Sequence, residues 1–119
     1  MPDGSIRLIV RQGIKPGKLE EFKELACQFT AGTEADDPGT LGYEWFISPD
    51  GTECFLNEFY GSSEAFLDHF AKIGPKIGIM LEISPLLEAV VLGDPSPEAR
   101  EALSKLGAKF YAPHVGFCR

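Results

Sequence analysis

The sequence lacks the features that mark a membrane or secreted protein. No window approaches the roughly 20 continuous apolar residues that a membrane-spanning helix requires. The first ten residues, MPDGSIRLIV, also lack the basic-then-apolar order of a secretion signal. We therefore expect a cytoplasmic protein with no membrane partner.

Cysteine is scarce. Cys27, Cys54 and Cys118 cannot all pair within one chain, and none is at CxxC spacing with another cysteine or a histidine. We expect reduced thiols and no metal site, because closed metal sites need ligands at short, regular spacing.

Positive charge is also sparse and is not clustered. Eleven lysines and arginines stand against eighteen acidic residues, and the net charge of -7 would repel a phosphate backbone. No phosphate loop, dinucleotide fingerprint, GxSxG elbow or HExxH motif is present. Nucleic-acid binding, phosphoryl transfer, hydride transfer from a Rossmann cofactor and metal-dependent proteolysis have no support in the sequence.

What the sequence does contain is one globular domain. Its 119 residues are 44% apolar, which is enough to bury a core without disulfides. Apolar periodicity and turn residues divide the chain into strands and helices. The predicted elements are a strand over 6–12, a helix over 18–33, a hairpin of strands over 40–48 and 53–60, a helix from Ser62 to about Pro75, a strand over 86–92, a third helix opening at Ser96, and an extended segment over 109–115.

The order βα, ββ, αβ predicts an α+β, ferredoxin-like split βαβ fold, in which two helices back an antiparallel four-stranded sheet. Residues 76–84 are ambiguous, with a short helix as one interpretation. We expect a domain over 1–95. The helix and extended segment over 96–119 should pack on that domain or on a partner subunit.

Polar residues stand among aromatic ones in the stretch FLNEFYGSSEAFLDHF, residues 55–70. His69 is on the flank of the second helix's apolar stripe, where it can face solvent or act as a base in a cavity. Asn57 shares a strand face with two phenylalanines, so its amide is satisfied structurally or contacts a ligand. Glu58 and Tyr60 are on the other face, where solvent or a subunit interface would accommodate them.

The strings PGTLGYEWF (38–46) and EAFLDH (64–69) resemble the antibiotic biosynthesis monooxygenase (ABM) domain, or quinol monooxygenase, family of the dimeric α/β-barrel superfamily. The likeness covers about residues 6–92. It implies a homodimer and a ligand cavity between each sheet and its helices. It also implies oxidation of a phenolic, quinol or anthrone-like substrate by O2 without flavin or metal.

On this resemblance we assign catalytic roles to His69, as the base, and to Asn57, which would orient the substrate. The expected aromatic lining of the cavity is Trp45, Tyr43, Phe66, Phe70 and Phe59. Aromatic residues in strands also commonly only pack. Two alternatives stay open: a non-catalytic dimeric protein that binds a small hydrophobic molecule, and a haem-binding or haem-degrading relative.

Overall fold

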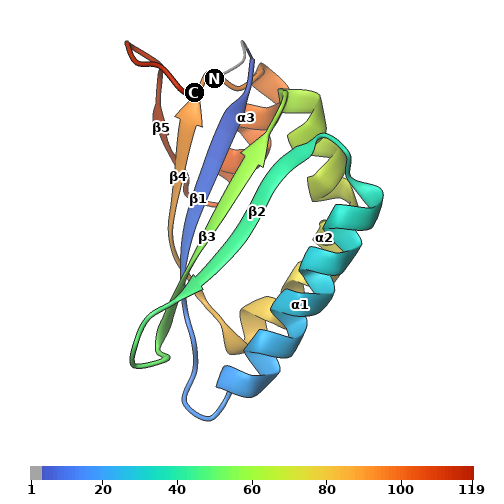
Figure 1. Ribbon diagram of the computed structural model, residues 1–119, viewed down its shortest axis with the longest axis vertical. Helices are drawn as coiled ribbons and strands as arrows, with labels where there is room; N and C mark the ends of the chain where they lie inside the picture. The colour runs from blue at the N-terminus through green and yellow to red at the C-terminus, as the bar shows by residue number, and fades with distance from the viewer. Residues whose placement is uncertain (1–3) are drawn as a thin grey trace.

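The computed structural model describes residues 4–119 and shows one mixed five-stranded sheet in the order β2-β3-β1-β4-β5 (Figure 1). All neighbouring strands are antiparallel except β4 and β5, which are parallel. In chain order the elements are β1 (Ile6–Gly13), α1 (Leu19–Asp36), β2 (Thr40–Ile47), β3 (Glu53–Tyr60), α2 (Ser63–Ile83), β4 (Leu86–Gly93), α3 (Pro97–Ser104) and β5 (Lys109–Tyr111).

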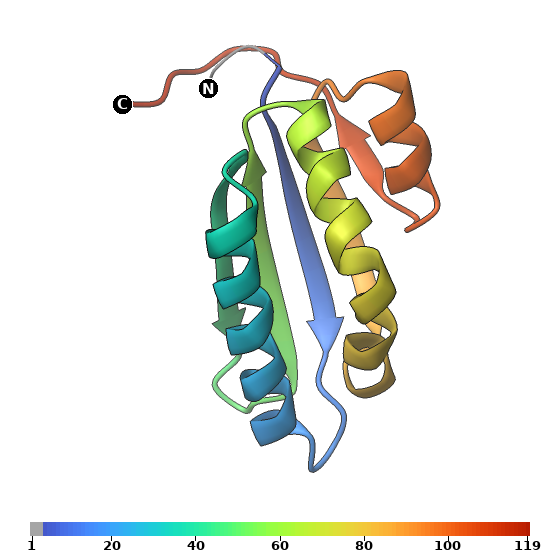
Figure 2. The same ribbon diagram turned by 90° about the vertical axis from the view of Figure 1, so that its right-hand side faces the viewer.

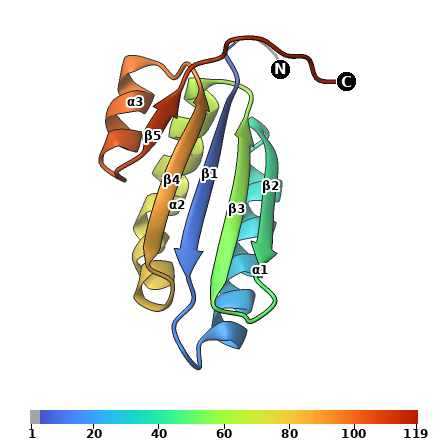
Figure 3. The ribbon, with the colours of Figure 1, turned by 90° about the vertical axis from the view of Figure 1, so that its left-hand side faces the viewer.

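The molecule has two layers. Helices α1 and α2 lie side by side on one face of the sheet (Figure 2), and the opposite face carries no helix (Figure 3). Burial alternates along the strands, as a period of two residues requires. On β1 the side chains of Ile6, Leu8 and Val10 point toward the helices and are buried. The core therefore lies between the helices and one sheet face.

The predicted ferredoxin-like class is confirmed, but the sheet has one strand more than expected. Residues 109–111 form β5 at the sheet edge, where Val91 is in register with Phe110. Pro113, which has no N–H to donate, follows just beyond this short strand. The terminal segment is thus an edge strand followed by irregular chain.

The prediction that the second helix ends near Pro75 is wrong, because α2 runs unbroken to Ile83. A proline inside a helix costs about 3 kcal/mol, since it removes one backbone hydrogen bond and crowds the preceding turn. Here Ile73, Ile77 and Met80 lie on the inward face of α2, which is directed toward the sheet. Met80 and Ile83 are buried beyond the proline, and burial of each such side chain is worth about 1.5–3 kcal/mol, so together they offset the cost of the proline.

Helix α3 and strand β5 pack on the rest of the domain, whereas residues 112–119 are exposed. Ser96 caps α3, and its backbone N–H donates to Ser63 Oγ at 2.9 Å, which ties α3 to the start of α2. Ala99 and Leu103 are fully buried in the main core cluster. The guanidinium of Arg100 stacks 4.5 Å from the centre of the Phe110 ring, linking α3 to β5.

Two further observations bear on the sequence predictions. All three cysteines are free thiols, with Cys54 buried and the other two exposed. From residue 4 onward, none of the helices combines the length and the hydrophobicity that crossing a bilayer would need.

Candidate functional site

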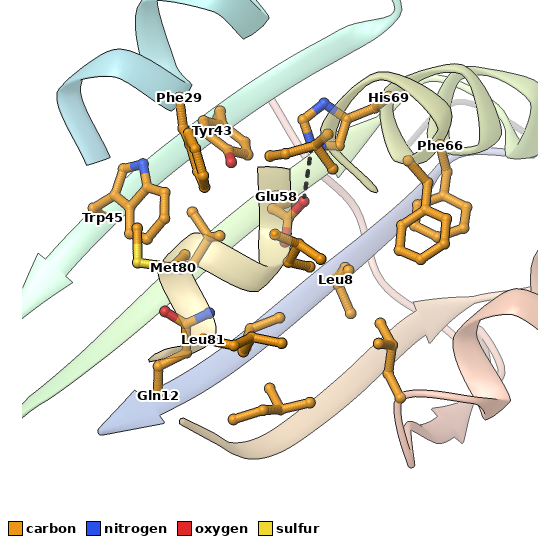
Figure 4. Close-up of a pocket in the computed structure, with 17 residues that line it drawn as sticks. Leu8, Gln12, Phe29, Tyr43, Trp45, Glu58, Phe66, His69, Met80 and Leu81 are labelled. Carbon is orange, nitrogen blue, oxygen red and sulfur yellow. Dashed lines mark ion pairs between the residues drawn. The ribbon is translucent and has the colours of Figure 1, made fainter. Parts of the chain in front are cut away.

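A cavity of about 80 Å³ lies between the inner face of the sheet and helices α1 and α2 (Figure 4). Strands β1, β2 and β3 form its floor, and α2 forms much of its roof. Its walls are mainly aliphatic and aromatic. The titratable side chains that line it are Tyr43, Glu58 and His69.

His69 lies on the inward face of α2 and is buried, with 4% of its side chain exposed. Helix α2 begins where the sequence predicts, because Ser62 caps it by accepting a hydrogen bond from the backbone N–H of Ala65 at 3.1 Å. His69 Nδ1 lies 2.9 Å from Asp37 Oδ2. A carboxylate can only accept, so Nδ1 carries a proton, and in the neutral tautomer Nε2 is the unprotonated nitrogen. Figure 4 shows that nitrogen directed toward Glu58.

Asp37 follows the last residue of α1 and is the C-cap of that helix. A carboxylate at this end is unfavourable, because the helix dipole is negative there. The loop that holds it packs tightly on α2: a Cβ built on Gly39 would be 2.6 Å from Ala65 Cβ. A glycine at position 39 therefore lets Asp37 reach the α2 face that carries His69.

Lys72, one helical turn after His69, neutralises the same carboxylate. Its Nζ contacts Asp37 Oδ1 at 2.6 Å and the carbonyl oxygen of Asp36 at 2.6 Å. Burial alone would raise the pKa of Asp37, but hydrogen bonds from Lys72 and His69 outweigh it and hold that pKa below its ordinary value. Asp37 is thus an ionised, doubly bonded anchor for the imidazole.

Glu58 faces His69 from β3 with 7% of its side chain exposed, and its Oε1 lies 3.8 Å from His69 Nε2. The hydroxyl of Tyr60 donates to the same oxygen. Burial in an apolar wall raises the pKa of Glu58 to about 7, although the hydrogen bond from Tyr60 opposes that rise. A carboxyl group that changes protonation state near neutral pH therefore lies against the imidazole.

Aromatic side chains form one wall of the cavity. Tyr43 lies edge-on between the rings of Trp45, at 5.7 Å, and His69, at 5.3 Å. The indole N–H of Trp45 donates to Thr30 Oγ1 at 2.9 Å, which fixes the ring against α1. Burial, followed by the nearby Glu58 carboxyl, raises the pKa of Tyr43, so its phenol stays protonated.

Gln12 is a polar group near the other end of the cavity. In the sheet Glu58 is in register with Leu8, so Gln12 is four residues, or about 13 Å, further along β1. Its amide oxygen accepts from Ser84 Oγ at 3.2 Å. The cavity therefore has polar groups at both ends and an apolar middle.

A second hollow of about 190 Å³ lies outside the cavity between α1 and α2. It is lined by polar residues that include Gln28, Asp36 and Lys76. Phe29, His69 and Ile73 line both hollows, so these three side chains form the partition between them. The polar hollow and the cavity therefore adjoin each other at His69.

The structure brings five of the predicted site residues together around the cavity: His69, Trp45, Tyr43, Phe66 and Phe70. Asn57 and Phe59 are elsewhere, and their predicted place in the cavity is wrong. They point to the outer sheet face, where Asn57 Nδ2 donates to Glu44 at 3.4 Å and Phe59 packs under the guanidinium of Arg7. Successive strand residues face opposite sides, so Glu58 points inward at the place where Asn57 was expected.

Sequence reasoning did not assign site roles to Asp37, Lys72, Glu58, Tyr60 or Gln12. His69 and Lys72 are three residues apart on a helix and must share a face, which was a usable signal. The acidic loop DDPG (36–39) contains a proline and a glycine, so its local pattern indicates only the end of a helix. Nothing in the local pattern places that loop against α2.

The described part of the chain, residues 4–119, contains no group of three His, Cys, Asp or Glu side chains arranged to hold a metal ion. The oxygens and nitrogens around His69 instead bond to one another and to Lys72. The cluster has the composition of an acid–base site.

The fold and the site define an α+β, ferredoxin-like protein with a buried histidine–carboxylate cluster in an apolar cavity. Residues 5–72 match the antibiotic biosynthesis monooxygenase family, and the chain belongs to that family. Among curated proteins, no sequence matches this chain.

Solved structures share the fold. MupZ from Pseudomonas fluorescens is 21% identical with a TM-score of 0.85, and the alignment covers 98% of this chain and 96% of MupZ. A variant of SnoaB from Streptomyces nogalater, described as a cofactor-independent oxygenase, is 17% identical with a TM-score of 0.65 over 78% of this chain and 95% of its own. Rv0793 from Mycobacterium tuberculosis is 22% identical with a TM-score of 0.66 over 77% and 96%. At these identities the likeness shows the fold alone.

Proposed function

We propose that the protein is a cofactor-independent monooxygenase that oxidises a phenolic, quinol or anthrone-like aromatic substrate with O2. The observation that carries this proposal is the hydrogen bond between His69 Nδ1 and Asp37, because it leaves Nε2 as a base facing an apolar, aromatic cavity. Family membership and the description of SnoaB support the reaction type.

In this reaction His69 Nε2 removes a proton from an acidic O–H or C–H of the substrate. The ionised Asp37 stabilises the imidazolium that forms, and Lys72 holds Asp37 in place. The resulting anion is electron-rich enough to give one electron to O2, and the two radicals then combine. The apolar walls exclude water and provide a low-dielectric site in which these charges interact strongly.

The decisive experiment measures oxygen uptake and quinone formation by metal-free protein with a panel of anthrones and hydroquinones. We expect turnover above buffer autoxidation, and a loss of about 100-fold or more in His69→Gln, since general bases contribute that much. His114→Gln is the matched control, because His114 is exposed in the terminal segment. Equal rates for wild type and buffer would overturn the proposal for these substrates.

A binding assay separates the enzyme from the non-catalytic alternative. Trp45 is the only tryptophan in the sequence and lines the cavity, so an aromatic ligand that enters should change its fluorescence. A fluorescence change without turnover would instead support a protein that binds a small hydrophobic molecule. A Soret band on haem titration would support the haem-binding alternative.

We also propose that two copies pair through the outer sheet face, as the family resemblance implies. That face exposes large apolar side chains, with Phe46 55%, Phe55 46% and Leu87 46% exposed. Clustered apolar residues of this size on an uncovered sheet are typical of subunit interfaces. Pairing would cover the face that lacks helices.

A further inference from the structure

The geometry points to Glu58 as a second catalytic residue, the proton donor to the oxygen-derived intermediate, working opposite the base His69. This inference rests on the proposed function. It assigns a separate acid to a reaction that otherwise has only one proton-transferring group in its cavity. Glu58 lines the cavity floor, and His69 lines the roof.

Position is the first argument. Glu58 Oε1 and His69 Nε2 are 3.8 Å apart, and both side chains are more than nine-tenths buried. An intermediate formed beside Nε2 is therefore also within reach of the carboxyl group. Among the ion pairs formed by residues 4–119, Glu58 has no cationic partner other than His69. The other ion pairs of the cluster hold Asp37, on the far side of the imidazole ring.

Protonation state is the second argument. The titratable groups that face the Glu58 carboxyl are His69 from α2, Tyr43 from β2, Tyr60 from β3 and, beyond the imidazole, Asp37 after α1. Burial raises the pKa of Glu58 to about 7, so a large fraction is a neutral acid at neutral pH. The raised pKa values of Tyr43 and Tyr60 make both phenols far poorer proton donors.

The chemistry balances for a substrate with an activated methylene group. His69 takes the first methylene proton, and the carbanion and O2 form a C–O bond through a radical pair, which gives a peroxide anion. The Glu58 carboxyl donates its proton and gives the hydroperoxide. The Glu58 carboxylate then removes the second methylene proton as the O–O bond breaks, and the leaving hydroxide takes the proton held by His69. In sum, one methylene group and one O2 give one ketone and one water, with both residues restored.

Two assays on Glu58→Gln separate this role from that of the base. The first follows anaerobic exchange of the substrate methylene protons with deuterium from heavy water, which needs only His69. The second follows oxygen-dependent formation of the ketone. We expect exchange to be retained in Glu58→Gln while oxidation falls by about 100-fold, whereas His69→Gln should lose both. Glu101→Gln on α3, an exposed site, is the matched control and should behave as wild type.

A second variant tests the acid without removing it. Tyr60→Phe deletes the hydrogen bond that favours ionised Glu58, so the descending limb of the pH–rate profile, near pH 7 in wild type, should move to higher pH. A purely structural role for Glu58 would scale the profile without moving it.

The outcomes are distinct. Oxidation by folded Glu58→Gln at a rate near that of wild type, or an unmoved limb in Tyr60→Phe, overturns the role of Glu58 and leaves the proposed function standing. Absence of both exchange and oxidation in wild type overturns the proposed function and this role with it.

Discussion

Replacing Glu58 by glutamine should make the protein more stable at neutral pH than the wild type, although it removes a titratable group from the candidate site. Glu58 is buried among apolar side chains, and its folded-state pKa of about 7 lies above the ordinary value of 4.5. Ionised glutamate is therefore favoured in the unfolded chain. Glutamine has nearly the same shape and carries no charge at any pH.

The magnitude follows from these two pKa values. The pKa of the Glu58 carboxyl rises from 4.5 to about 7 on folding. At a pH where the group is ionised in both the folded and the unfolded protein, this rise lowers the free energy of unfolding by about 3 kcal/mol. The folded state binds the proton more tightly, so this contribution to stability is fully present below about pH 4.5. It is lost progressively as the pH rises through about 7.

The assay is urea denaturation of both proteins from pH 4 to pH 8 at constant ionic strength. The two free energies of unfolding should differ by a constant near pH 4 and diverge by about 3 kcal/mol by pH 8, in favour of the variant. The divergence includes the coupling between Glu58 and His69. Parallel curves across this range would refute the assignment of Glu58 as a buried, neutral acid.

Asp37 provides an internal check with the opposite sign. Its pKa is lowered by its partners, so its contribution is present above its ordinary value of 3.8 and is lost as the pH falls below that value. Its effect therefore lies outside the range in which Glu58 acts and should be unchanged in Glu58→Gln.

Three further predictions concern the elements that position the site. Gly39→Ala should destabilise the protein by about 1–3 kcal/mol in thermal denaturation and weaken the NMR signature of the His69 Nδ1 hydrogen bond, because the new Cβ would be 2.6 Å from Ala65 Cβ. Gly32→Ala, where no atom lies within 4 Å of the new Cβ, is its control and should be neutral or stabilising. Leu103→Ala should cost about 2–5 kcal/mol while unfolding stays a single transition, because Leu103 is fully buried in the main core; two separate transitions would show that α3 folds independently. If two copies pair as proposed, Phe55→Lys should shift that dimer to a monomer in light scattering, whereas Glu101→Gln should not; an unchanged dimer mass in Phe55→Lys would exclude the outer face as the pairing surface.

Much of the fold was predictable because it depends on local pattern. The period of two residues in 40–48 and 53–60 identified the hairpin, and the serines at 62 and 96 marked the helix starts that the structure confirms. The order of strands and helices along the chain was then compatible with only a few sheet topologies. The end of α2 was wrongly predicted at Pro75, because the energetic cost of a proline in a helix was considered without the burial of the apolar helix face that follows it.

The site itself was predictable only in part. Position 69 could be placed near an apolar helix stripe, and the aromatic residues at 43 and 45 could be placed on one strand face. Which face of β3 turns inward could not be decided, because Phe55 and Phe59 make one face as apolar as Leu56 and Tyr60 make the other. The sequence analysis therefore placed Asn57 in the cavity, whereas Glu58 is the residue of this strand that lines it.

By itself the sequence determined most of the secondary structure, the ferredoxin-like order and the candidate histidine, since each depends on residues within a few positions of one another. Only the tertiary structure brought Asp37 across 32 residues to His69 and turned Glu58 toward the same ring. Those contacts depend on how α1, α2 and β3 pack. They place an ordinary helix-flank histidine between two carboxyl groups, one ionised by its partners and one whose pKa burial raises to about 7.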